Sequence, residues 1–128
     1  MGEKVRMKKT LTHPLAGRTY QKYRKLFLSK PGARESFPFG PQAAVYKTKA
    51  GKIFAILSPE GEAWYGNLKC DPHWALTLRK QYPGSIEPGY HMNKKHWNTV
   101  HLNGPLLPNL IREMVDLSFA LVSPVTRK

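Results

Sequence analysis

Side chains able to bind anions are concentrated in one short stretch of the chain, residues 88–102, which reads PGYHMNKKHWNTVHL. Lysine, histidine and asparagine donate hydrogen bonds to phosphate oxygens or base edges, and tyrosine and tryptophan can stack on bases. We therefore predict that residues 90–97 form a nucleic-acid-binding loop and that a following strand, residues 97–102, anchors it. The candidate contact residues are Lys69, Arg79, Tyr90, His91, Asn93, Lys94, Lys95, His96, Trp97 and Asn98.

Lys94 and Lys95 lie on a predicted loop between two strands, where a hairpin tip can enter a groove or lie along phosphates. Ordinary structural roles compete with this interpretation. Trp97 begins a predicted strand, and we favour a position in the core for it. Asn98 could serve only to pin the backbone of the turn, and Lys94 could pair with an acidic side chain. The loop is therefore predicted as a binding element on its charge and its predicted exposure.

A metal site is the first alternative chemistry. Cys70 and His73 are close in sequence, but a predicted strand–helix junction separates them. His91, His96 and His101 follow at a spacing that suits neither one face of a helix nor one face of a strand. Zinc sites use recognisable sets of four ligands, and hard cations prefer carboxylates. The chain has only 8 Asp and Glu among 21 Lys and Arg, so we expect no metal and no organic cofactor.

A cysteine nucleophile is the second alternative. Cys70 follows Lys69 and precedes a predicted helix N-terminus, a setting that could favour the thiolate. A buried free cysteine at the end of a strand is nevertheless much commoner than a catalytic one. The sequence contains no phosphate-binding glycine loop, nucleophile elbow or zinc-protease helix. We therefore expect a protein that is not an enzyme.

The formal net charge of +13 over 128 residues favours a polyanionic partner. Residues 1–25 carry eight basic residues and one acidic residue, and residues 1–12 are predicted to form a flexible basic arm. We expect DNA or another nucleic acid as the partner, with an acidic protein as the alternative, and a monomeric state. The single cysteine and the lack of a secretory signal or apolar span favour a cytoplasmic protein that does not bind membranes.

The elements that position the loop follow from hydrophobic periodicity and from turn residues. Residues 13–128 are predicted to form one domain of the α+β class, a two-layer sandwich with helices on one face of an antiparallel sheet of about five strands. A helix that Thr12 caps is expected to end before Pro31-Gly32, and residues 37–41 form a rigid linker. The other expected elements are strands 44–48, 52–58 and 64–70, a helix from Pro72 to before Pro83, strands 86–90 and 97–102, and a helix between Pro108 and Pro124.

Several segments match a known pattern. They are PGARESFPFGP (31–41), GKIFAIL (51–57), NLKCDP (67–72), YPGSIEPGYHMNKKHWNTVHL (82–102) and the final helix with Ser118. On these segments the chain resembles the YjbR/MmcQ family of small bacterial proteins, over roughly residues 15–123. The resemblance implies a two-layer domain shaped like type III secretion chaperones and compared with the CyaY-like fold. It also implies DNA binding through a "double wing" arrangement of hairpins.

A protein-interaction module is the alternative from a different functional class. A sheet like that of a secretion chaperone could take up an extended partner segment along its open face or its edge. A contiguous basic face that includes residues 94–98 would favour nucleic acid. A hydrophobic groove away from that face would favour a protein partner.

Overall fold

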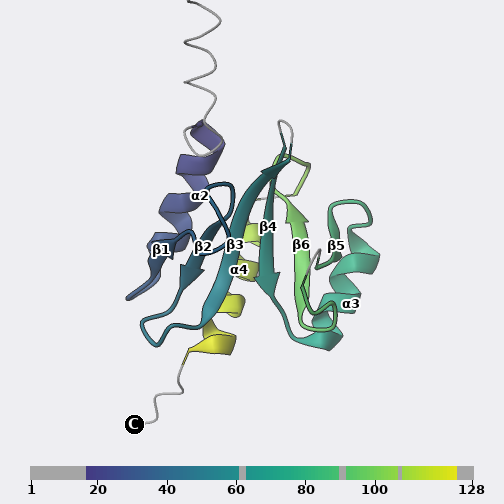
Figure 1. Ribbon diagram of the computed structural model, residues 1–128. Coiled ribbons are helices and arrows are strands. Elements are labelled where there is room, and N and C mark those ends of the chain that lie inside the picture. Colours follow the sequence, from purple (N-terminus) through teal and green to yellow (C-terminus); the bar gives the residue numbers. More distant parts are fainter. Residues whose placement is uncertain (1–16, 61–62, 90–91, 107, 124–128) are drawn as a thin grey trace, which may run out of the picture.

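The computed structural model describes residues 17–60, 63–89, 92–106 and 108–123. Within them lies one six-stranded sheet of order β1-β2-β3-β4-β6-β5, in which every neighbouring pair is antiparallel (Figure 1). The elements are α2 (Arg18–Leu28), β1 (Arg34–Ser36), β2 (Ala44–Lys47), β3 (Ile53–Glu60), β4 (Ala63–Lys69), α3 (Pro72–Gln81), β5 (Ile86–Pro88), β6 (Trp97–His101) and α4 (Pro108–Val122). The predicted α+β fold is confirmed, with one more strand than expected.

The additional strand is β1, which the sequence pattern does not predict. Its three residues, Arg34–Ser36, are all polar, so no hydrophobic alternation marks them. Pairing with β2 places Arg34 opposite Lys47 and Glu35 opposite Tyr46. Glu35 therefore faces the helices, where tyrosine hydroxyls bind its carboxylate.

The helix limits follow from local chemistry. The Asp71 carboxylate caps α3 by accepting hydrogen bonds from the backbone N–H groups of His73 (3.1 Å) and Trp74 (3.0 Å), and Pro72 occupies the first turn, as predicted. In contrast, α2 begins after Gly17 without a side-chain cap. The predicted cap Thr12 and the predicted arm lie outside the described residues.

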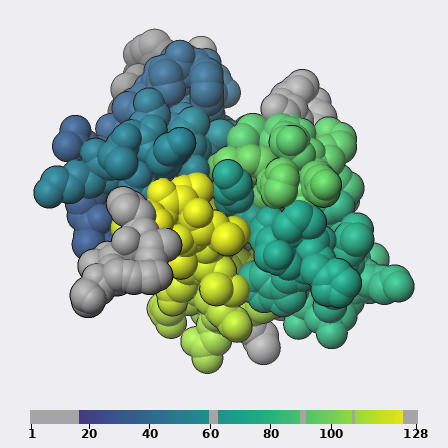
Figure 2. All heavy atoms as spheres, turned by 90° about the horizontal axis from the view of Figure 1, so that it is seen from below, coloured from purple at the N-terminus to yellow at the C-terminus, as the bar shows by residue number. Residues whose placement is uncertain are grey.

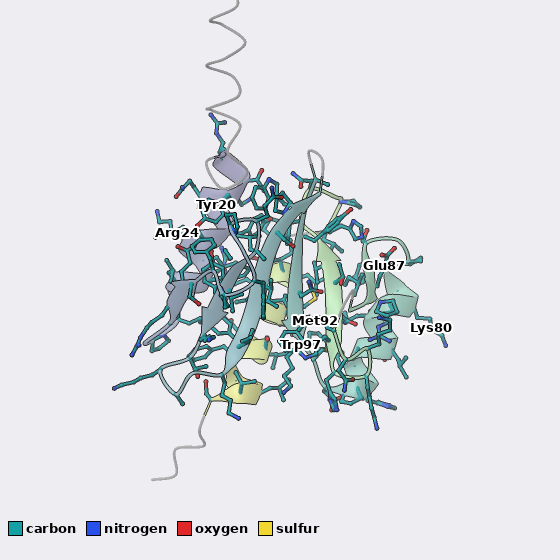
Figure 3. All side chains as sticks on the ribbon, in the orientation of Figure 1. Tyr20, Arg24, Lys80, Glu87, Met92 and Trp97 are labelled. Atoms are coloured by element: carbon teal, nitrogen blue, oxygen red, sulfur yellow. The ribbon has the colours of Figure 1, made fainter. Side chains whose placement is uncertain are left out.

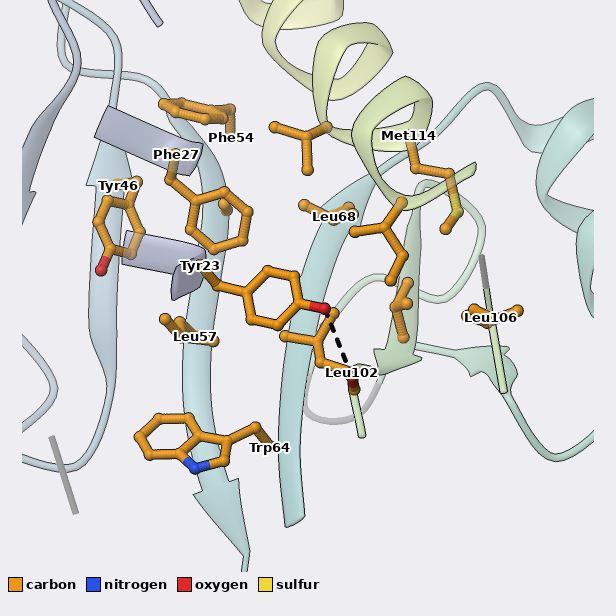
Figure 4. Close-up of a cluster of buried hydrophobic side chains, with 14 of the residues drawn as sticks. Tyr23, Phe27, Tyr46, Phe54, Leu57, Trp64, Leu68, Leu102, Leu106 and Met114 are labelled. Atoms are coloured by element: carbon orange, nitrogen blue, oxygen red, sulfur yellow. Dashed lines mark hydrogen bonds between the residues drawn. The ribbon is translucent and has the colours of Figure 1, made fainter. Parts of the chain in front are cut away.

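One hydrophobic core fills the space between the sheet and the helices. Phe27 of α2, Tyr46 of β2 and Phe54 and Leu57 of β3 are fully buried there, and the close-up in Figure 4 shows this cluster. The α3 helix adds Ala75 and Leu78 to the same core. Figure 1 shows α4 behind the sheet, and α2 and α3 contribute to the same core, so none of the described helices lies on the face toward the viewer. We call this second face the open face.

Strand alternation decides which side chains reach the open face. In β4, Trp64 and Leu68 join the core, so Tyr65, Asn67 and Lys69 face the other way. Their partners on β6 are His101, Thr99 and Trp97, which share the open face with them. No helix in the described part of the chain has the length and hydrophobicity needed to cross a bilayer.

Candidate nucleic-acid interface

The turn that leads into β6 is built around Asn93. Its backbone carbonyl accepts hydrogen bonds from the N–H groups of His96 (3.2 Å) and Trp97 (3.0 Å). Its side-chain oxygen accepts a third from the N–H of Lys95 (2.9 Å). This use of an asparagine side chain is typical of tight turns. Asn93 therefore shapes the predicted binding loop, and the amide oxygen it needs for this is not free for a ligand.

Arg79 of α3 holds the same loop from the helix side. Its Nε donates to the Oδ1 of Asn98 (2.7 Å), and its Nη2 donates to the backbone carbonyls of Trp97 (3.2 Å) and Lys94. Asn98 is only 2% exposed and lies on the core side of β6. These two predicted contact residues therefore position the loop from beneath. A buried Asn98 cannot reach a phosphate.

Gly89 allows the two ends of the loop to meet closely. Its N–H donates to the carbonyl of Trp97 (2.8 Å), and its own carbonyl accepts from the Lys94 ammonium (3.0 Å). A Cβ at Gly89 would lie 2.8 Å from the Cβ of Trp97 and 3.1 Å from that of Met92. The first distance is shorter than Cβ atoms tolerate and the second is unusually tight, so only glycine fits this position without moving the loop.

Lys94 does not pair with an acidic side chain among the described residues, where its partner is the carbonyl of Gly89. Lys95 is exposed, and none of the described residues bonds its ammonium group. His96 is half-buried, and its carbonyl accepts from the N–H of Cys70 (2.7 Å), which ties the loop to the end of β4. Tyr90 and His91 lie outside the described residues.

Trp97 lies on the open face and is half-buried. It is not part of the core between sheet and helices, so the preference for a core position was wrong. The reason is strand parity, because Val100 of the same strand is in the core and residue 97 must then face the opposite way. Figure 3 shows Trp97 beside Met92, in front of β4 and β6. Lys69 is its direct cross-strand partner.

Basic side chains gather at the end of the sheet where β6 begins. Arg34 opens β1, Lys47 closes β2 and Lys69 closes β4, and antiparallel pairing brings these ends together. We call this region the basic end, which comprises Arg34, Lys47, Lys49, Lys52, Lys69, Lys94 and Lys95. Figure 2 looks onto this end and shows the segment around residue 50 (blue-teal) and the loop around residue 95 (green) on opposite sides of it.

Sequence reasoning missed the lysines of the β2–β3 hairpin. The segment KTKAGK (47–52) carries three of them around a turn in which Gly51 has a φ of 89°. Alternating lysines beside a predicted hairpin turn were the available signal. The register that aligns this hairpin with Lys69 and with residues 94–95 is a tertiary feature. This register cannot be derived from the sequence of each strand taken separately.

Carboxylates do not neutralise the basic end within the described residues. Glu87 pairs with His101 (3.4 Å), Asp116 pairs with Lys30, and Asp71 caps α3. These carboxylates are therefore engaged elsewhere and leave the cations of the basic end without an ion-pair partner among the described residues.

Glu35 forms a separate polar cluster that sequence reasoning also missed. Its carboxylate accepts hydrogen bonds from the hydroxyls of Tyr46 (2.6 Å) and Tyr20 and from the Nε of Arg24 (3.1 Å). Burial raises the pKa of Glu35, but these hydrogen bonds and the Arg24 charge outweigh it and leave that pKa lowered. Burial and the Glu35 carboxylate raise the pKa of both tyrosines. The cluster joins α2 to β1 and β2 on the core side of the sheet.

Cys70 lies in an environment unsuited to nucleophilic chemistry. It is buried, and burial, together with the nearby Asp71 carboxylate, raises the pKa of its thiol to about 11. A thiol with so high a pKa is almost fully protonated at neutral pH. The described residues contain no group of three or more His, Cys, Asp or Glu side chains placed to hold a metal ion.

Comparisons with known proteins agree on one family. The YjbR family model matches residues 28–121. The chain is 40% identical to the uncharacterised protein YbdF of Escherichia coli O157:H7 over 77% of this chain and 80% of that protein. It is 34% identical to the uncharacterised protein YjbR of Escherichia coli K12 over 72% of this chain and 76% of that protein.

Two solved structures share the fold. A Deinococcus radiodurans protein with a DUF419 domain superposes with a TM-score of 0.75 at 34% identity, covering 80% of this chain and 76% of that one. A Pseudomonas syringae protein superposes with a TM-score of 0.71 at 30% identity, covering 84% of this chain and 99% of that one.

Proposed function

The chain belongs to the YjbR family, and we propose that it binds nucleic acid through the basic end of its sheet. The relatives carry no functional description that could be transferred, so the proposal rests on the surface of this chain. It includes the expectations that the protein is not an enzyme and that it acts as a monomer in the cytoplasm.

The observation that carries the proposal is a set of cations without carboxylate partners. In the described part of the chain, no ion pair involves the side chains of Arg34, Lys47, Lys69 or Lys95. Strand register places the first three on the open face at one end of the sheet. Because the strands already fix the backbone at these positions, binding of a phosphate chain requires no ordering of the backbone there, which favours binding.

Phosphate contacts would dominate this interaction. Lysines that reach phosphates carry no sequence information, and Asn98, which could have read a base edge, is buried. We therefore expect weak sequence selectivity and a strong dependence of affinity on salt concentration. The basic arm would add phosphate contacts without adding selectivity.

An acidic protein partner is the competing outcome, since an acidic surface would meet the same cations. The depression between α2 and α4 offers this alternative little support. It is small, and its lining combines the apolar Leu26 and Ile111 with the cations Lys22 and Arg112. This depression is much smaller than the hydrophobic groove of several hundred Å² that is expected for a peptide-binding surface.

The experiment is a fluorescence-anisotropy titration of a labelled oligonucleotide at several salt concentrations. We expect the logarithm of the binding constant to fall linearly with the logarithm of salt, with a slope of about −0.7 to −0.9 for each phosphate contacted. Undetectable binding at about 50 mM salt, a concentration at which phosphate contacts remain strong, would contradict the proposal and favour the protein partner.

A further inference from the structure

We infer that the nucleic acid bound at the basic end is single-stranded and that one of its bases stacks on Trp97. This inference rests on the proposed function and specifies its substrate class. It concerns the open face of the sheet, which none of the described helices covers (Figure 1).

The described residues of the loop before β6, 92–96, argue against a projecting wing. Arg79 holds this loop down through the backbone carbonyls of Lys94 and Trp97, and Gly89 closes its base through the carbonyl of Trp97. Entry into the major groove of a duplex requires a projecting helix or a two-stranded ribbon. A loop tied back onto its own sheet instead leaves Trp97 and Lys69 partly exposed at the basic end of the open face. The middle of that face is buried around Val45, Ile56 and Thr99, so the platform for unpaired bases is confined to this end.

Trp97 supplies the stacking surface on this platform. It is half-buried and lies outside the core, so part of its surface faces solvent. Met92 lies beside Trp97. The backbone N–H of Trp97 donates to the carbonyl of Asn93, and the backbone carbonyl of Trp97 accepts from the N–H of Gly89. The half-buried Trp97 side chain has already lost part of its rotamer freedom in the free protein, so stacking of a base costs little more. Every base has a π-face, so the contact suits any sequence.

The cations near Trp97 have the arrangement that a single strand requires. Lys69 lies directly opposite Trp97 across the β4–β6 pair, and Lys47 lies opposite Arg34 across the β1–β2 pair. Strands are about 4.8 Å apart, so the row from β1 to β6 spans roughly 19 Å. This length suits several nucleotides, which is the site size of small sheet-based single-strand binders. Phosphates would follow the lysines across the strands while a base turns onto Trp97.

The test compares a 12-nucleotide oligo-dT with a 12-base-pair duplex by anisotropy at one low salt concentration. We expect tighter binding of the single strand. Trp97→Leu should weaken that binding about 5- to 150-fold, the range for loss of one stacked base, and Trp97→Phe should retain most of it. The matched control is Tyr82→Leu, which removes an exposed aromatic at the end of α3, away from the platform, and should leave the affinity unchanged.

A second measurement does not depend on the folding of the leucine variant. Oligo-dT should quench the tryptophan fluorescence of the unmodified protein and should not quench that of Trp97→Phe, which keeps Trp64 and Trp74. Equal affinity for duplex and single strand, together with no effect of either Trp97 substitution, would overturn the inference while leaving nucleic-acid binding in place. Absence of binding to both oligonucleotides would overturn the proposed function as well.

Discussion

At the scale of single residues, the existing partners of a charged or amide side chain decide whether that side chain can bind a ligand. Arg79 and Asn98 have the chemistry of nucleic-acid contacts, but they bond each other, and Arg79 also bonds the loop backbone. Lys47 and Lys69 have no ion-pair partner among the described residues. Residue type therefore identified the candidates. Their hydrogen-bond partners then separated the side chains that position the loop from those that are available to bind a ligand.

Glu35 gives a prediction at this scale. Glu35→Gln should lower the free energy of unfolding at pH 7 by about 1–3 kcal/mol, because Tyr20, Tyr46 and Arg24 all donate to the carboxylate. The lowered pKa of Glu35 means that its contribution is fully present above the ordinary glutamate pKa of about 4.3. This contribution is lost as the pH falls through the lower, folded-state value.

Urea denaturation of both proteins from pH 7 down to pH 3 measures this effect. The gap in stability between the parent and Glu35→Gln should be constant near neutrality and should narrow in the acidic range. Glu113→Gln, which changes an exposed carboxylate of α4, is the control and should cost little at any pH. A gap of the same size at pH 7 and pH 3 would contradict the assignment of a charged Glu35.

At the scale of elements, the sequence specifies most of the structure through local signals. Asp71-Pro72 starts α3, and the predicted strand from Trp97 onward is present as β6. The all-polar strand β1 gives no such signal, because its pairing depends on the neighbouring β2. The same limit applies to the site: the loop could be predicted from its residues, but the alignment of Lys47 with Lys69 required the register of the whole sheet.

Ser118 of α4 gives the prediction for elements. It is fully buried, it accepts a hydrogen bond from the N–H of Lys69 (2.9 Å), and its hydroxyl donates to the carbonyl of Phe54 (2.6 Å). The hydroxyl thus links β3 to β4 next to the irregular register at residues 46–47. Ser118→Ala leaves both backbone groups without this partner and should cost about 1–3 kcal/mol of stability.

The measurement is the urea midpoint together with hydrogen exchange of the Lys69 amide, which should become faster. Ser123→Ala is the matched control, because that hydroxyl only returns to the carbonyl of Phe119 in the preceding turn of the same helix. A Ser118→Ala variant no less stable than Ser123→Ala, with an unchanged exchange rate at Lys69, would show that the link contributes nothing.

At the scale of the whole molecule, the distribution of charge connects the fold to the proposed function. The chain carries a formal net charge of +13, and much of it lies in residues 1–25. The predicted basic arm, residues 1–12, could bind polyanions without help from the folded domain. The end of the sheet carries a separate set of cations, which the strands hold in fixed positions. We expect these cations to contact phosphates directly, and we expect cations elsewhere on the folded domain to contribute little.

The most direct measurement compares two charge-matched double variants by salt-dependent anisotropy titration of one labelled oligonucleotide. Lys47→Gln with Lys69→Gln removes two cations from the basic end, and Lys22→Gln with Lys25→Gln removes two exposed cations from α2. Each protein is measured with and without residues 1–12, which separates the arm from the sheet. Thermal melts confirm that all variants fold.

We predict that the Lys47/Lys69 variant reduces the steepness of the salt dependence by about 1.4–1.8, as expected for two lost phosphate contacts, whereas the Lys22/Lys25 variant changes it little. Deleting residues 1–12 should weaken binding but leave this difference between the two variants in place. Equal effects of the two double variants would contradict a binding role for the basic end. So would a Lys47/Lys69 variant that binds like the parent while deletion of the arm abolishes binding, because the arm alone would then be the polyanion-binding element.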